Sequence, residues 1–99
     1  MNAQQYMDRV HDLPCCVCMR FAMVQMSPTT AHHVFHGRYG NERPDDWNVI
    51  PLCRGHHQGD FDTTKVAIHR EKARWATLYG EDHTYVATTQ KRILGYVRD

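Results

Sequence analysis

Two short pairs of possible metal ligands constrain this 99-residue chain more than any other feature of its sequence. Cys15 and Cys18 form a C-x-x-C pair, and Cys53 and His56 form a C-x-x-H pair. This gap lets two side chains from one tight turn reach the same tetrahedral ion, and two such pairs supply the four ligands of a closed structural zinc site. A chain of this length buries a limited core, so the sequence predicts a zinc ion that pins the N-terminal turn to the middle of the domain.

The N-terminal segment and the cysteines together indicate where the protein works. The segment MNAQQYMDRVHDL lacks the apolar core of a signal peptide, and no apolar run is long enough to suggest a membrane span. We therefore expect a cytoplasmic, reducing setting, in which closely spaced cysteines bind metal before they form disulfides. Cys16 has the wrong gap to Cys18 for a zinc knuckle and is expected to be a small apolar filler. The alternative for the four ligands is a set of buried thiols and a surface histidine.

Apolar periodicity and turn residues predict a small α+β domain, with residues 1–99 as a single unit. The expected helices cover about residues 3–12, a short stretch after Cys53, 69–79 and 82–98. The expected strands cover 19–26, 30–35 and 47–52. Residues 37–46, GRYGNERPDD, read as a loop by composition.

Two pairs of adjacent histidines, His32–His33 and His56–His57, form the second prominent pattern. Neighbouring residues on a helix point about 100° apart, so a His56 that closes the zinc site leaves His57 free for another task. On a strand, neighbours face opposite sides unless a twist brings both toward a cleft. One ring of a pair can then hold a metal while the next remains free to act as a base near neutral pH.

The order of these motifs resembles that of a known family of nucleases. Paired histidines precede Gly37-Arg38, an asparagine precedes an apolar strand, PLC-x-x-HH follows, and AIHREKARWATLYG comes later. This order is similar to that of the HNH (ββα-metal, or His-Me finger) endonucleases, and within them to the phage and prophage branch that includes the Ref recombination-enhancement nuclease. The resemblance covers about residues 15–80. It implies a small ββα-metal domain stapled by zinc, with flanking helices that include one at about 82–98.

The resemblance also assigns roles to single residues. It implies that His33 is the general base, that Asn48 tethers the loop and orients this base, and that His57 binds the catalytic ion. His32 occupies a metal-binding place before the base, and His69 completes or braces the metal site. The resemblance places the structural zinc on four residues: Cys15, Cys18, Cys53 and His56. Many family members carry a further ligand where this chain has Phe61, which leaves Asp60, His69 or water as the third ligand.

These residue types suit hydrolysis of a DNA phosphodiester bond. A free imidazole activates water, and one divalent cation relieves charge on the phosphate and the leaving oxygen. Mg²⁺ or Mn²⁺ is the expected catalytic ion, although imidazole ligands leave nickel, cobalt and zinc open. By resemblance alone, the protein works in a bacterial host cell, in phage or prophage recombination, with a recombinase filament as a possible partner.

DNA binding has to rest on a local patch, because the net charge is only +1 with the histidines neutral. The basic residues considered for phosphate contacts are Arg38, Lys65, Arg70 and Arg74. A solvated surface explains these side chains almost equally well. Two other functions remain open: a non-catalytic zinc-knuckle adaptor that binds DNA or protein, and a structural or metal-handling protein without a nucleic-acid partner.

Overall fold

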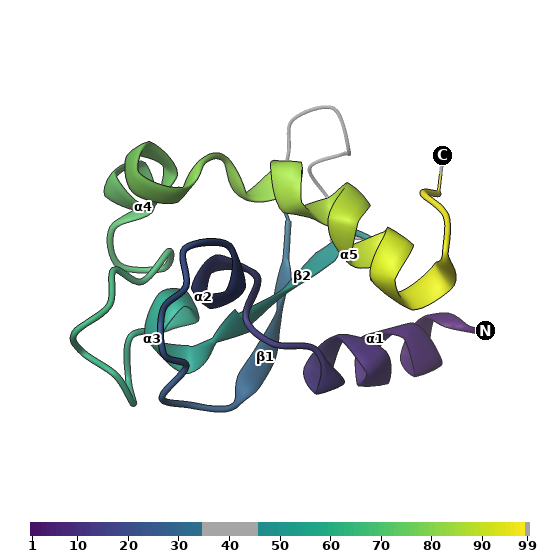
Figure 1. Ribbon diagram of the computed structural model, residues 1–99, viewed down its shortest axis with the longest axis horizontal. Coiled ribbons are helices and arrows are strands. Elements are labelled where there is room, and N and C mark those ends of the chain that lie inside the picture. Colours follow the sequence, from purple (N-terminus) through teal and green to yellow (C-terminus); the bar gives the residue numbers. More distant parts are fainter. Residues whose placement is uncertain (35–45, 99) are drawn as a thin grey trace.

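A computed structural model of the chain describes residues 1–34 and 46–98, which form a small mixed α/β domain around a two-stranded sheet. Figure 1 shows the two strands at the centre, with helices on both sides of them and both chain ends on the same side of the view. The elements in chain order are α1 (Ala3–Asp12), α2 (Cys16–Arg20), β1 (Thr29–His33), β2 (Val49–Cys53), α3 (Arg54–His57), α4 (Lys72–Tyr79), the 3₁₀ helix η2 (Asp82–Tyr85) and α5 (Val86–Leu94).

The sheet is antiparallel, and its register places the two histidines of β1 beside the start of β2. His32 pairs with Ile50 and His33 with Val49, while Thr30 pairs with Leu52 near the other end. All five residues of β2 are buried, which is expected of a strand with helices packed on both of its faces. Because α3 begins directly after Cys53, the end of this buried strand fixes the position of the next four residues.

Helix α1 begins with a capping box and packs its apolar face on the sheet. The Asn2 side chain accepts a hydrogen bond from the Gln5 backbone N–H, and the Gln5 side chain accepts one from the Asn2 N–H. Tyr6 and Val10 of this helix form a small core with Val49, against which α5 also packs. A larger core surrounds Trp75, whose ring makes edge contacts with Tyr79 and Tyr85. None of the helices in the described residues has the length and apolar character of a membrane span.

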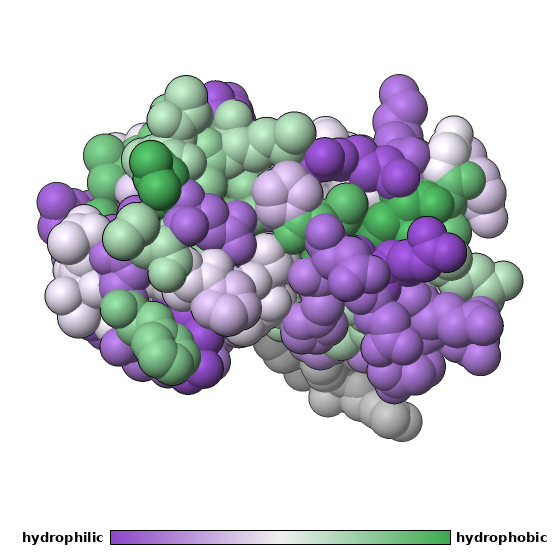
Figure 2. Space-filling view, turned by 60° about the horizontal axis from the view of Figure 1, so that its bottom comes forward, coloured by the Kyte–Doolittle hydropathy of each residue, from purple (hydrophilic) through white to green (hydrophobic). Residues whose placement is uncertain are grey.

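The predicted strand at residues 19–26 is wrong. Helix α2 ends at Arg20, and the chain then turns through Ala22, which has a φ of +54°, while the Met23 N–H bonds to the Cys18 carbonyl. No neighbouring strand pairs with the segment, so an alternating apolar pattern alone does not make it extended. Five apolar side chains remain exposed as a result: Met19, Phe21, Met23, Val24 and Met26. Figure 2 shows one face of the molecule, on which apolar side chains form several groups among polar ones.

The other elements differ from expectation mainly at their ends. Helix α4 starts at Lys72 rather than at 69, because the His69 N–H bonds to the His57 carbonyl instead of starting a helix. The final helix ends at Leu94 rather than near 98, because Gly95 adopts the left-handed conformation and its N–H bonds to the Lys91 carbonyl. The expected helices at 3–12 and after Cys53 are confirmed as α1 and α3.

Two candidate metal centres

The four predicted zinc ligands lie together in a buried group, here called the cysteine cluster: Cys15, Cys18, Cys53 and His56. The His56 Nδ1 atom is 3.5 Å from the Sγ atoms of Cys15 and Cys18 and 3.3 Å from that of Cys53, and the Sγ atoms of Cys18 and Cys53 are 3.8 Å apart. A tetrahedral zinc ion with Zn–S of about 2.3 Å and Zn–N of about 2.0–2.1 Å requires S···N edges of about 3.5 Å and S···S edges of about 3.8 Å. The observed spacing therefore fits a structural metal such as zinc.

Short local elements position these four ligands. Cys15 caps the N-terminus of α2 and Cys18 lies one turn further on, so both sulfur atoms face the same side. Cys53 ends β2, and His56 follows on the single turn of α3. The Gln25 side chain accepts a hydrogen bond from the Cys15 backbone N–H at 2.7 Å, which ties the following loop to the cluster.

The electrostatics of the cysteine cluster also favour a cation. The hydrogen bond with Cys53 and burial raise the pKa of Cys15, and burial raises the pKa of Cys18 to about 11. The hydrogen bond from Cys15 lowers the pKa of Cys53, with help from His56. Three buried thiols this close together cannot all ionise without a compensating charge, and a bound divalent ion would let all three cysteines lose their protons.

Three further imidazoles form a second group, here called the histidine cluster: His32, His57 and His69. Each offers a ring nitrogen within 4.8 Å of the others, and the ring centroids are 4.7 to 5.4 Å apart. The rings come from β1, from α3 and from the segment before α4. As the helical geometry predicts, His56 and His57 belong to different clusters although they are adjacent in sequence.

A chain of two hydrogen bonds through Thr30 determines which nitrogen of His57 carries the free lone pair. The Thr30 hydroxyl donates its only proton to the Leu52 carbonyl at 2.7 Å. The same oxygen lies 2.8 Å from His57 Nδ1, so it accepts a proton from that nitrogen. The lone pair of His57 is therefore on Nε2, which is the arrangement of a metal ligand oriented by a partner on its other nitrogen.

His32 is oriented in the opposite sense by Asp82. Its Nε2 atom lies 3.0 Å from the Asp82 carboxylate, which only accepts hydrogen bonds when ionised, and both side chains are buried. This leaves the lone pair on Nδ1, a buried atom without a hydrogen-bond partner among the described residues. A buried polar atom of this kind calls for an explanation, and a metal ion bound with His57 and His69 would supply one.

Two rings of the histidine cluster, those of His57 and His69, favour the neutral form. Burial, followed by repulsion from His32 and His69, lowers the pKa of His57 to about 4. Burial and the nearby His32 also lower the pKa of His69. Neutral imidazoles keep their lone pairs near pH 7, so these rings can bind a cation without first losing a proton. Of the candidates for the third ligand, His69 joins the cluster, whereas the Asp60 carboxylate pairs with Arg54.

His33, the predicted base, follows His32 directly on β1 and is partly exposed. Its Nε2 atom is 2.9 Å from the Asp46 carboxylate, so the lone pair is on Nδ1. His33 contributes less than burial, His32 and His69 to the lowered pKa of His57. Asn48, predicted to orient the base, accepts a hydrogen bond from the Val34 N–H through its backbone carbonyl.

The basic residues predicted to contact DNA differ in their exposure and in their hydrogen-bond partners. Lys65 is paired with Asp62 at 2.7 Å and is largely buried, and Arg70 donates to the Gly59 carbonyl at 3.0 Å. Both therefore hold the segment that follows α3. Arg74 is exposed on α4 and pairs with Glu71. Arg38 lies outside the described residues.

Sequence reasoning did not identify Thr30 and Asp82 as partners of the histidines, nor did it place Asp46 on His33. Asp82 falls at the start of the expected helix at 82–98, and Asp46 falls in the expected loop at 37–46. Their side chains reach histidines 50 and 13 residues away in the chain, so local spacing carried no signal for either contact.

These observations define a small mixed α/β domain with a buried Cys₃His cluster that can hold a structural metal. Over residues 1–96 the chain matches the family described as Protein of unknown function (DUF968), and it belongs to that family. No curated protein and no solved structure gives a significant match to the chain.

Proposed function

We propose that the protein is a metal-dependent DNA endonuclease of the HNH (ββα-metal) kind, with structural zinc in the cysteine cluster and a second ion in the histidine cluster. One observation carries this proposal: the adjacent rings of His56 and His57 belong to different clusters. The chain therefore has three converging imidazoles in addition to the one in the cysteine cluster. Two of these imidazoles are held by hydrogen-bond partners, His57 by Thr30 and His32 by the buried Asp82, and each keeps a lone pair available. Such orientation is typical of metal ligands.

His33 is the proposed general base. With Nε2 donating to Asp46, the Nδ1 lone pair can take a proton from the water that attacks phosphorus as the P–O3′ bond breaks. Asp46 fixes the tautomer and stabilises the charge that develops on the ring, as a carboxylate does for a catalytic histidine in other hydrolases. When bound, the second ion would neutralise charge on the phosphate and on the leaving oxygen.

The three imidazoles of the histidine cluster limit which divalent ion can be the second, catalytic ion. Three imidazoles suit Co²⁺, Ni²⁺ or Zn²⁺ best, and Mn²⁺ accepts imidazole ligands more readily than Mg²⁺, which prefers oxygen ligands. Within the pair Mg²⁺ or Mn²⁺, we therefore propose Mn²⁺. A role in phage or prophage recombination, including work beside a recombinase filament, rests on the sequence resemblance alone.

The test is nicking of supercoiled plasmid by the purified, zinc-loaded chain with Mg²⁺, Mn²⁺, Co²⁺ or Ni²⁺ added. His33→Ala is expected to lower the nicking rate by about 10²–10⁴-fold, the usual contribution of a general base. Zinc content and the circular dichroism spectrum should stay unchanged in that variant. His11→Ala is the matched control, because His11 is an exposed histidine on α1 that belongs to neither cluster.

Two outcomes would contradict the proposal. If the wild-type chain binds DNA with the expected salt dependence but cuts it with none of these ions, it is a zinc-knuckle adaptor. If His33→Ala and His11→Ala nick DNA equally fast, the cleavage does not use the proposed base.

A further inference from the structure

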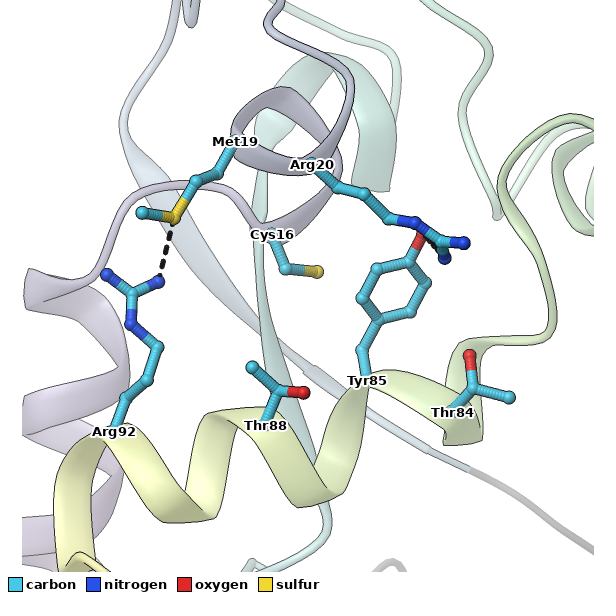
Figure 3. A pocket seen from close by; sticks show the side chains of 7 residues that line it. All are labelled: Cys16, Met19, Arg20, Thr84, Tyr85, Thr88 and Arg92. Carbon is cyan, nitrogen blue, oxygen red and sulfur yellow. Dashed lines mark hydrogen bonds between the residues drawn. The ribbon is translucent and has the colours of Figure 1, made fainter.

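A pocket of about 310 Å³ lies between α2 and the η2–α5 segment. Cys16, Met19 and Arg20 reach into it from α2, and Thr84, Tyr85, Thr88 and Arg92 reach into it from the opposite wall (Figure 3). None of the four ligands of the cysteine cluster and none of the three histidines lines it. Its size is at the lower end of the range of small-molecule sites, about 300–1,000 Å³.

The charge in this pocket is of one sign. Arg20 and Arg92 line it, and no acidic residue does so in the part of the chain that the structure describes. The Arg92 guanidinium donates to the Met19 sulfur at 3.0 Å, and a thioether is only a weak acceptor. Neither arginine pairs with a carboxylate among the described residues. Guanidinium groups that have no carboxylate partner in the described residues suit a carboxylate or phosphate ligand, which they bind through paired hydrogen bonds.

Arg20 is held in place before any ligand arrives. Its Nη1 atom donates to the Tyr79 carbonyl and to the Tyr85 hydroxyl, at 3.3 and 3.1 Å. Its guanidinium also lies over the rings of Phe21 and Tyr85, at 5.1 and 5.6 Å from their centroids. A fixed guanidinium loses little conformational freedom on binding, which favours affinity.

The space between the two arginines has a different character. Figure 3 shows the Cys16 thiol and the Tyr85 ring between them, with the Thr88 side chain below. Thiol, ring and methyl surfaces suit an apolar or aromatic body, and the threonine hydroxyl offers one further polar contact. From these features we infer that the pocket binds a small organic anion, an aromatic or apolar body that carries a carboxylate or a phosphate. This inference does not depend on the proposed nuclease activity.

The test is a titration of the ¹⁵N-labelled, zinc-loaded chain followed by amide chemical shifts. Four probes are compared: thymidine 5′-monophosphate, benzoate, uncharged thymidine and inorganic phosphate. Saturable shifts in residues 16–20 and 84–92 with either organic anion, and not with thymidine, are the expected result. A preference for the nucleotide assigns the anionic group as phosphate, and a preference for benzoate assigns it as carboxylate.

Arg92→Gln is expected to weaken binding of the organic anion by about ten-fold or more, since a charge-assisted hydrogen bond is lost. Lys91→Gln is the matched control, because Lys91 is the exposed neighbour on α5 that does not line the pocket. Thr88→Trp fills the pocket from an exposed position and should abolish binding by a second route. The inference is overturned if no probe gives saturable shifts at millimolar concentration, if inorganic phosphate binds as well as the nucleotide, or if Lys91→Gln weakens binding as much as Arg92→Gln.

Discussion

Removal of metal from the cysteine cluster should unfold most of the domain. The cluster joins α2 to the end of β2, and its ligands Cys18 and Cys53 are 35 residues apart in the chain. A cross-link that closes a loop of this length lowers the entropy of the unfolded chain by an amount worth about 4 kcal/mol. Metal–ligand bonding adds to this, since structural zinc sites contribute about 10–16 kcal/mol of apparent binding energy in small domains.

The loss is large beside the stability of an ordinary domain, which is about 5–15 kcal/mol. The cross-link contribution alone corresponds to a fall in Tm of at least about 15 °C, at about 4–8 °C per kcal/mol for a chain of this size. Cys18→Ser removes one ligand and should lower both zinc content and Tm strongly. Cys16→Ser is the control, because Cys16 lies outside the cluster and its replacement should cost about 1 kcal/mol or less.

The assay combines zinc content per chain, measured by atomic absorption, with thermal unfolding followed by circular dichroism under reducing conditions. The reasoning is refuted if the zinc-free chain unfolds at the same temperature as the zinc-loaded chain. It is also refuted if Cys16→Ser loses as much zinc as Cys18→Ser, because the two cysteines would then have equivalent roles.

Three further predictions follow from single contacts. Asp82→Asn should weaken Mn²⁺ or Co²⁺ binding at the histidine cluster by about 10–100-fold, because the ligand His32 loses its hydrogen-bond partner. Titration calorimetry measures the affinity, and an unchanged affinity would contradict the prediction. Because the pKa of His57 falls from 6.5 to about 4 on folding, the unfolded chain binds more protons there, and stability should fall as pH drops through that window. The decline in Tm should be shallower in His57→Gln, and parallel curves for the two proteins would refute the assignment. Gly59→Ala should lower the free energy of unfolding by about 1–3 kcal/mol, since Gly59 has a φ of +80° and an added Cβ would lie 2.9 Å from the Ala67 Cβ. An unchanged Tm would refute this prediction.

The parts of the site that could be predicted from sequence depend on short-range geometry. The gap between Cys15 and Cys18 on one helical turn, and between Cys53 and His56 at a strand–helix junction, fixes the direction of each side chain relative to its partner. The separation of His56 from His57 follows from the same helical rotation. These relations hold wherever the elements lie in the fold, so spacing alone was sufficient to identify each pair, and the fold then brings the two pairs together.

The segment at residues 19–26 shows why local pattern has limits. Its apolar side chains fit a strand, but a strand needs a partner, and the sheet of the described residues contains only β1 and β2. The chain instead closes α2 with a bond from Met23 to Cys18, and Gln25 binds the Cys15 backbone. The need to satisfy the backbone around the cysteine cluster outweighs strand propensity here, and a single sequence carries no signal of that competition.

Which nitrogen of each histidine faces the cluster depends on residues from distant parts of the chain. Thr30 fixes His57 only because the sheet register places it opposite Leu52, whose carbonyl takes the hydroxyl proton. Asp82 fixes His32 only because η2 returns to β1 after 50 residues. The two histidines therefore present different nitrogen atoms, Nε2 of His57 and Nδ1 of His32, to one space. A chain with the same ligands but without these partners would keep the motif, yet its rings could turn and protonate on either nitrogen. The partners, more than the histidines themselves, would then decide whether the cluster can bind an ion.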